Sequence, residues 1–349
     1  MADLLLRSMM KASRILLLGA GNMARPILHD LLARNPTQAA SLSIITGMSA
    51  GKNKQSVWDT ITRLPGRKMQ QITLLSREEV ARKPLTEVFD TVLFCAKPQQ
   101  LVATLTAHRA NIAPGATVIS VAAGIPVSDI AAACGKPVEA VRAMPHLPLA
   151  LCGLYSENPH ALEQAKTLLA GLGTPVILAS EDAFHAYSTH AGSGPAFAAR
   201  AIEQTGALSE TFVKNWLHEA QEDGIRASVV QNTIAATRVY LKETGIAPAD
   251  FAAQVRSAKG MTNAGLLAMG SPPPDSERFG TPEQLAAQRA IAERHGSLPP
   301  EERYGSQRRA SIFSKATTTS ASPLQMTGEY TFSPYLTWVD TLPPLWAMP

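Results

Sequence analysis

A glycine-rich segment that directly follows a short apolar run constrains the fold of this chain more than any other feature. The run is Ile15–Leu18, and Gly19-Ala20-Gly21-Asn22-Met23-Ala24 follows it and opens a segment with helical periodicity. In a strand–turn–helix unit the first glycine permits the tight turn, and the second lets the backbone approach a pyrophosphate. The helix N-terminus adds free N–H donors for the anion. We therefore interpret Gly19–Ala24 as a dinucleotide-binding turn; an ordinary glycine-rich turn is the alternative.

Further short apolar runs alternate with helical patterns as far as about residue 180. Several runs are nearly continuous in Val, Ile and Leu, which is typical of strands covered on both faces. Because helical segments such as Ala24–Arg34 and Pro98–Ala110 lie between them, residues 1–180 predict a Rossmann-type, doubly wound parallel α/β sheet. The expected strands are Ile15–Leu18, Leu42–Thr46, Gln71–Leu75, Thr91–Cys95, Thr117–Val121, Ala140–Ala143 and Pro175–Leu178, with a late strand or turn at Ala150–Gly153.

The strand signal stops near Ser180, and residues 181–270 read as a second, all-α domain. Such a domain often finds its missing packing partner in another subunit, so a homodimer or a higher homo-oligomer is expected. Residues 271–349 hold 11 of the 25 prolines and predict a mostly disordered tail, either an added extension or the product of a shifted reading frame. The expected helices are Glu181–Tyr187, Pro195–Thr205, Phe212–Glu222, Ser228–Lys242 and Pro248–Arg256.

Composition excludes several classes of protein. The net charge of +4 comes from 32 basic and 28 acidic residues without a Lys/Arg block, which argues against nucleic-acid or membrane-surface binding. No apolar stretch approaches the roughly 20 residues of a membrane span. The three cysteines form no close pair and no metal-ligand spacing, which favours a reducing cytoplasm and no metal. His185 and His190 lack a third ligand, so we interpret them as structural histidines.

The end of the second strand bears on the choice of nucleotide. An NAD site usually places Asp or Glu there, whereas this chain has no carboxylate between Thr46 and Asp59. Ser49, Lys52 and Lys54 follow instead and suit a 2′-phosphate; a solvated basic loop is the alternative. The sequence therefore favours NADPH, with NADH as the second choice.

Two more strand ends carry candidate cofactor residues. Cys95-Ala96-Lys97-Pro98 ends the fourth strand, and Ala122-Ala123-Gly124 follows the fifth. In open α/β sheets the ligand crevice lies at the carboxyl edge of the strands. Small residues at that edge would let a flat ring lie against the sheet.

Six motifs in order give residues 14–269 a resemblance to the pyrroline-5-carboxylate reductases. The resemblance implies a Rossmann domain, a helical domain that interlocks with its twin in a dimer, and reduction of the small molecule 1-pyrroline-5-carboxylate to L-proline with NAD(P)H. The motifs are Gly19–Ala24, Ala96-Lys97-Pro98, Ala122-Ala123-Gly124, Arg142-x-Met144-Pro145, Gly192-Ser193-Gly194-Pro195-Ala196 and Val255–Leu266.

The last motif carries the catalytic residues that the resemblance implies. It places the substrate carboxylate on the Ser257 hydroxyl and on the backbone of Gly260, Met261 and Thr262. It assigns to Thr262 the hydroxyl that hydrogen-bonds the imine nitrogen, so Ser257 and Thr262 are the expected catalytic residues. Helix capping is the alternative for both side chains.

Several positions depart from the family pattern. Lys259 stands where the family has glycine, Ala258 where it has proline, and His146 where it has asparagine. These departures leave two other interpretations open. One is a catalytically weak, dinucleotide-binding interaction protein, and the other is a related imine or keto-acid reductase for a different ring size.

Overall fold

The computed structural model describes residues 13–20, 23–34, 39–46, 57, 72–148, 150–256 and 261–271. They form two compact units. The first holds the described residues up to Met144 together with Leu154–Pro175, and the second holds Pro145–Gly153 and residues 176–271. The predicted domain boundary at residue 180 lies near Val176, while Pro145–Gly153 groups with the helical unit. The predicted tail, apart from Ser271, lies outside the described residues.

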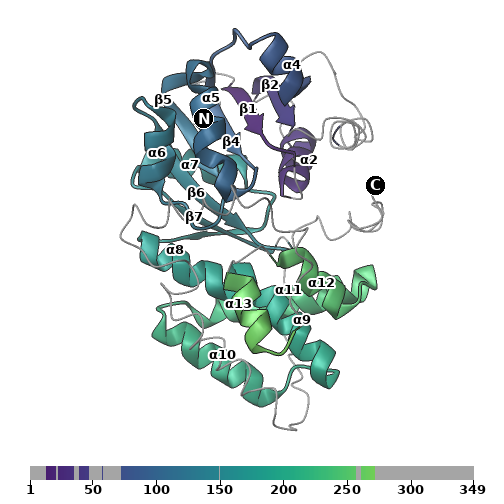
Figure 1. Cartoon of the computed structure of the whole chain (residues 1–349). Helices are drawn as coiled ribbons and strands as arrows, with labels where there is room; N and C mark the ends of the chain where they lie inside the picture. Colours follow the sequence, from purple (N-terminus) through teal and green to yellow (C-terminus); the bar gives the residue numbers. More distant parts are fainter. Residues whose placement is uncertain are drawn as a thin grey trace, which may run out of the picture. The chain divides into compact units, whose positions relative to one another are not determined.

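An eight-stranded sheet has the strand order β3-β2-β1-β4-β5-β6-β7-β8 (Figure 1). Every pairing from β3 through β6 is parallel, and the chain crosses from β3 at one edge to β4 beside β1. The predicted doubly wound parallel sheet is therefore confirmed, with a switch in strand order between β1 and β4. The strands are β1 (Ser13–Leu18), β2 (Ala39–Thr46), β3 (Ile72–Ser76), β4 (Phe89–Phe94), β5 (Ile112–Ser120), β6 (Glu139–Pro145), β7 (Leu151–Tyr155) and β8 (Thr174–Ile177).

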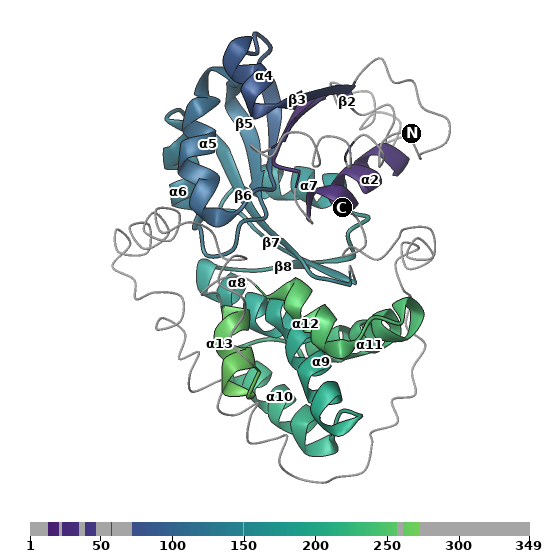
Figure 2. The same ribbon diagram turned by 45° about the vertical axis from the view of Figure 1, so that its right-hand side comes forward.

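Helices cover both faces of this sheet. Figure 2 shows α5 and α6 on one face and α2 and α7 on the other. The central strands are for this reason apolar on both sides, and Leu16, Val92 and Leu93 are fully buried. The helical segments are α2 (Ala24–Arg34), α4 (Arg77–Arg82), η2 (Pro98–Gln100), α5 (Leu101–Ala107), η3 (Arg109–Asn111), α6 (Val127–Cys134) and α7 (Pro159–Leu168).

The second unit is built from helices, as the sequence predicts. Its core contains Phe212, Trp216, Ile234 and Phe251, each at most 1% exposed. The first two predicted helices are joined by a π-helical segment, η4, so that residues 181–205 are helical throughout. The elements are α8 (Glu181–Tyr187), η4 (Ser188–Ser193), α9 (Gly194–Thr205), α10 (Glu210–Glu222), α11 (Ala227–Thr244), α12 (Pro248–Val255) and α13 (Met261–Ala268). Among the described residues, no helix combines the length and apolarity needed to cross a bilayer.

Candidate functional site

The carboxyl ends of β1, β4 and β5 lie at one edge of the first unit's sheet. Backbone hydrogen bonds hold the ends level: the Cys95 N–H donates to the Leu18 carbonyl oxygen at 2.8 Å, and the Val121 N–H donates to the Phe94 carbonyl oxygen at 3.0 Å. Because the three strands are parallel neighbours, the segments that follow them emerge side by side. The structure thus brings together three of the four segments that the sequence assigns to the cofactor.

At Gly19 the backbone of the turn lies very close to the backbone of Ala96. Its φ of +99° is in the region that favours glycine. A Cβ at this position would lie only 2.7 Å from the Ala96 backbone nitrogen. The Gly19 N–H donates to the Ile45 carbonyl oxygen at 2.9 Å, so the turn is held between β2 and the end of β4. A side chain here would displace the turn, which explains the first glycine of the motif.

The remaining cofactor candidates fall into two groups. Ala20 and Ala24 are buried, Met23 is half-buried, and Lys97 is exposed. Burial raises the pKa of the Cys95 thiol to about 12, so this group stays protonated and contributes no charge to the edge. Gly21, Asn22, Ser49, Lys52 and Lys54 lie outside the described residues.

The described residues fit a nicotinamide dinucleotide at this edge. Gly19 opens the turn into α2, where the helix N-terminus favours an anion. Ala96 and Ala122–Gly124 are small, and among the described residues no atom lies within 4 Å of the place where a Gly124 Cβ would be. Such a cofactor would supply a hydride; the protein's contribution is to hold and orient it.

The second unit contains the candidate substrate residues. Thr262 lies in the first turn of α13 and is 6% exposed. Its Oγ1 is 2.8 Å from the Ser193 Oγ at the end of η4. Met261 is half-buried, and its Sδ accepts a hydrogen bond from the Thr189 hydroxyl. Ser257 and Gly260, the other predicted carboxylate ligands, lie outside the described residues.

Residues on either side of that segment are tied to each other. The Arg256 Nε donates to the Asn263 Oδ1 at 2.8 Å. This contact fixes the distance between the end of α12 and the first turn of α13. It therefore limits how far the two ends of segment 257–260 can separate.

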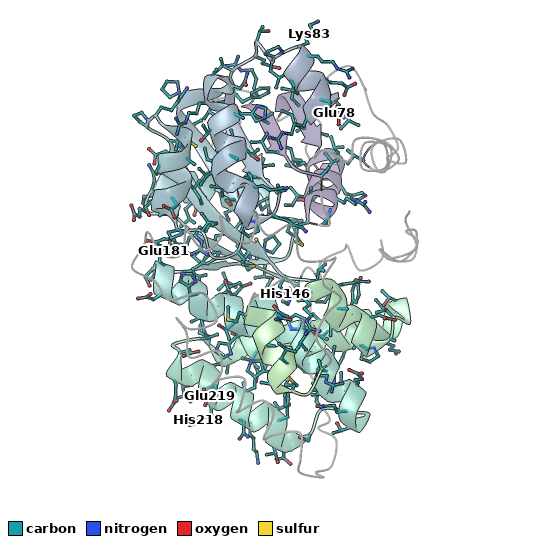
Figure 3. The ribbon with its side chains drawn as sticks, in the orientation of Figure 1. Glu78, Lys83, His146, Glu181, His218 and Glu219 are labelled. Atoms are coloured by element: carbon teal, nitrogen blue, oxygen red, sulfur yellow. The ribbon has the colours of Figure 1, made fainter. Side chains whose placement is uncertain are left out.

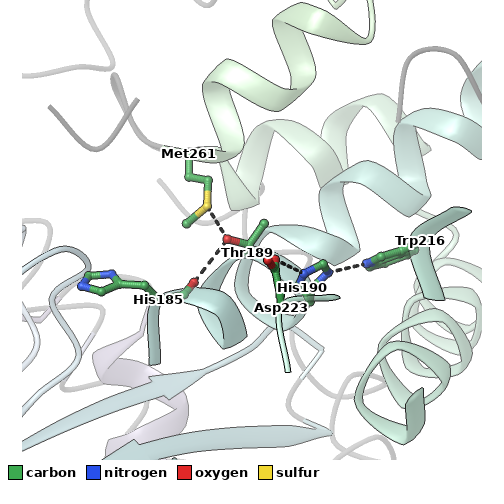
Figure 4. A network of polar contacts seen from close by, with 6 residues as sticks. All are labelled: His185, Thr189, His190, Trp216, Asp223 and Met261. Atoms are coloured by element: carbon green, nitrogen blue, oxygen red, sulfur yellow. Dashed lines mark hydrogen bonds and ion pairs between the residues drawn. The ribbon is translucent and has the colours of Figure 1, made fainter. Parts of the chain in front are cut away.

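A polar network centred on His190 was missed by sequence reasoning (Figure 4). The Trp216 Nε1–H donates to the His190 Nδ1 at 3.0 Å, and the His190 Nε2 lies 2.8 Å from the Asp223 Oδ2. Both ring nitrogens of His190 thus have protein partners. The sequence contained one signal of this network, the glycine at position 194. In the structure, a Cβ at Gly194 would lie 2.5 Å from the Trp216 ring. The Gly-Ser-Gly motif accordingly marks a close approach between α9 and α10.

His146, which replaces the family's asparagine, is buried just after β6 (Figure 3). The Leu151 N–H lies 3.4 Å from its Nδ1 and donates to it, so the ring proton resides on Nε2. Among the described residues Nε2 has no hydrogen-bond partner. Burial lowers the pKa of His146 to about 4, which keeps the ring neutral at physiological pH. His146 therefore offers one buried N–H donor.

Comparisons with known proteins agree with this arrangement. A family profile described as "NADP oxidoreductase coenzyme F420-dependent" matches residues 14–124, which contain β1 to β5. The pyrroline-5-carboxylate reductase of Pseudomonas aeruginosa is 28% identical over 264 residues, covering 74% of this chain and 88% of that protein. The pyrroline-5-carboxylate reductase of Arabidopsis thaliana is 26% identical over 256 residues, covering 71% and 84%.

A solved structure, the glycerol-3-phosphate dehydrogenase of Coxiella burnetii, shares the fold. Its TM-score is 0.50 at 12% identity, covering 87% of this chain and 97% of that one. The family profile and the curated relatives indicate an oxidoreductase with a pyridine-nucleotide-binding sheet. Within this class, the chain is similar to pyrroline-5-carboxylate reductases over about three quarters of its length.

The buried His146 should make the protein sensitive to acid. The folded-state pKa of about 4 lies below the ordinary value of 6.5, so the unfolded chain binds more protons between these pH values. The resulting stability is present above about pH 6.5 and is lost as the pH falls towards 4. The total is on the order of 3 kcal/mol. His146→Asn should flatten the fall in unfolding free energy between about pH 7 and pH 5, measured by urea denaturation.

His218 provides the matched control, because it is an exposed histidine on α10. His218→Asn should keep the wild-type pH profile. If the two variants showed the same profile, the acid sensitivity would not come from His146.

Proposed function

We propose that this chain reduces 1-pyrroline-5-carboxylate to L-proline with NAD(P)H, and that it prefers NADPH. The observation that carries the proposal is the Thr262 hydroxyl, buried at the start of α13 and held 2.8 Å from Ser193. Thr262 occupies the position to which the family resemblance assigns the contact with the imine nitrogen. A hydroxyl held in this way has little freedom left to lose when it binds the substrate.

The substrate carboxylate would bind next to Thr262. Ser257 and the backbone N–H groups of Gly260, Met261 and Thr262 are the proposed ligands. The N–H groups at the start of α13 have no partners within the helix, which favours an anion there. The Arg256–Asn263 hydrogen bond supports this assignment, because it limits the separation of the ends of the segment.

The cofactor would bind at the carboxyl edge of the first unit's sheet. The turn after β1 would hold the pyrophosphate, and the small residues after β5 would accommodate a flat ring. Ser49, Lys52 and Lys54 are the proposed contacts of a 2′-phosphate. The full proposed set is Gly19, Ala20, Gly21, Asn22, Met23, Ala24, Ser49, Lys52, Lys54, Cys95, Ala96, Lys97, Pro98, Ala122, Ala123 and Gly124.

The reaction asks little of acidic or basic side chains. A cyclic imine becomes a strong electrophile once its nitrogen is protonated, so beyond a proton donor at that nitrogen the protein mainly has to hold the ring carbon against the hydride donor. Thr262 would orient the imine nitrogen, and Ser257 would hold the carboxylate. The proposed chemistry would thus rely on the bound nucleotide and on these two hydroxyls.

Assembly and location complete the proposal. Residues 181–270 would pack against a second copy of the chain in a homodimer, and the protein would act in the cytoplasm on a small-molecule substrate. Lys259 and His146 motivate one other candidate, a catalytically weak dinucleotide-binding interaction protein. Turnover separates the two candidates, because the interaction protein would bind NADPH without oxidising it.

Loss of the Thr262 hydroxyl should abolish most of this turnover. The purified chain should oxidise NADPH only when 1-pyrroline-5-carboxylate is present. Thr262→Ala should lower kcat/KM by about 100-fold, since the contribution of a positioned proton donor is removed. NADPH affinity should be unchanged, and Thr262→Ser should recover much of the loss.

Thr244→Ala is a suitable control, because the Thr244 hydroxyl donates to the Tyr240 carbonyl oxygen within α11. This variant should keep the wild-type kcat/KM. Full activity in Thr262→Ala would mean that Thr262 serves only as a helix cap.

The nucleotide preference should depend on Lys52 and Lys54. Replacing both lysines by Ala should weaken NADPH binding by about 1.5–3 kcal/mol, the range for hydrogen bonds to charged groups. NADH binding should change little, because NADH lacks the 2′-phosphate. Comparing KM for the two nucleotides in wild-type and variant protein measures this. Equal or better use of NADH by the wild type would contradict the assignment.

A further inference from the structure

The π-helical segment η4 (Ser188–Ser193) connects the candidate catalytic hydroxyl to the network of His190. π-Helical turns are rare and often occur at functional sites. Ser193, the last residue of η4, is 4% exposed and contacts Thr262. His190 lies three residues earlier and is 1% exposed. Because His190 and Ser193 lie in the same helical turn, contacts that fix His190 also restrict the backbone at Ser193.

Trp216 of α10 and Asp223, which directly follows α10, hold His190 from two directions (Figure 4). The Trp216 indole is a hydrogen-bond donor only, so the His190 Nδ1 must accept, and the proton of the neutral ring lies on Nε2. Nε2–H then donates to the Asp223 carboxylate at 2.8 Å. One donor and one acceptor on opposite sides of the ring fix both its orientation and its tautomer.

Trp216 also contacts the backbone on the far side of Ser193. Its ring packs so closely on Gly194 that a Cβ there would lie 2.5 Å from it. Trp216 is itself fully buried and stacks edge to face with Phe212, with ring centroids 5.8 Å apart. The Trp216 indole therefore contacts the chain on both sides of Ser193: it donates a hydrogen bond to His190 and packs against Gly194.

The hydroxyl pair itself has a defined chemical consequence. Ser193 and Thr262 are joined by one hydrogen bond, and either oxygen can donate. When Ser193 donates, the Thr262 oxygen accepts that hydrogen bond, and the Thr262 O–H is left to donate to another acceptor. A fixed Ser193 therefore sets where the Thr262 proton points.

We propose that His190 is a positioning residue for the reduction: together with Trp216 and Asp223 it fixes η4, so that Ser193 holds the Thr262 hydroxyl in its reactive orientation. This inference rests on the proposed function. His190 acts through Ser193 and makes no contact with the substrate. Its effect on catalysis therefore requires the Thr262 hydroxyl.

A double-mutant cycle tests this dependence. His190→Leu removes both ring contacts and should lower kcat by about tenfold or more, as expected for a misplaced catalytic group. In the Thr262→Ala background the same substitution should cost less than about twofold, because the group that His190 positions is gone. His190→Gln, whose amide can both accept and donate, should recover part of the loss.

Phe251→Leu serves as the control for a general loss of stability. Phe251 is fully buried on α12 and packs against Tyr240, with ring centroids 5.1 Å apart. Phe251→Leu should change kcat by the same small factor in the wild-type background and in the Thr262→Ala background. If His190→Leu also cost the same factor in both, His190 would be a structural residue only, and the inference would be wrong.

Amide hydrogen exchange gives a second readout that needs no turnover. Trp216→Phe keeps an aromatic ring but removes the indole N–H, so it is the milder variant if His190→Leu folds poorly. Both variants should speed exchange in residues 188–193 and 261–268, and Phe251→Leu should not. Unchanged exchange there would refute the positioning role. An inactive wild-type chain would instead refute the proposed function, while exchange would still report on the network.

Discussion

Each polar side chain that η4 buries must find a partner inside the protein, and this requirement shapes the second unit. A buried polar group without a partner costs free energy comparable to a lost hydrogen bond or more. The Ser188 hydroxyl donates to the Phe184 carbonyl oxygen within the helix. The Thr189 hydroxyl contacts both the His185 carbonyl oxygen within the helix and Met261 of α13, whereas His190 and Ser193 bond to the end of α10 and to α13. The helices of this unit are thereby positioned around one turn.

In the first unit the main constraint is the lack of space at the glycine-rich turn after β1. Three parallel strands end side by side, and the segments after them must emerge without colliding. Gly19 leaves so little room against Ala96 that no side chain fits between them. The same closeness leaves the backbone accessible to a ligand. Close approach in one unit and buried hydroxyls in the other are the two features from which the proposed reaction follows.

The sequence predicts the strands well because their signal is local. Runs such as Ile15–Leu18 are apolar at every position, since helices cover both faces of the sheet. The π-helical turn was not predicted, because polar residues at buried positions interrupt the helical periodicity between Tyr187 and Gly194. The sequence suggests a structural role for His190, and its partners lie 26 and 33 residues further along the chain. Nothing local to His190 identifies them.

The candidate site could be predicted only in part for the same reason. Thr262 was identified from an ordered set of motifs, whereas its contact with Ser193 joins residues 69 positions apart. The grouping of Pro145–Gly153 with the helical unit likewise depends on tertiary contacts, such as the packing of the Tyr187 ring on Gly153. Spacing along the chain does not encode contacts of this range.

The most direct test of the central claim is to follow the hydride itself. The purified chain would be supplied with 1-pyrroline-5-carboxylate and NADPH carrying deuterium at the transferable position of nicotinamide C4, and the product would be analysed by mass spectrometry. The account predicts L-proline with a single deuterium at C5, formed in proportion to the NADPH consumed. Binding of NADPH without labelled proline would contradict it.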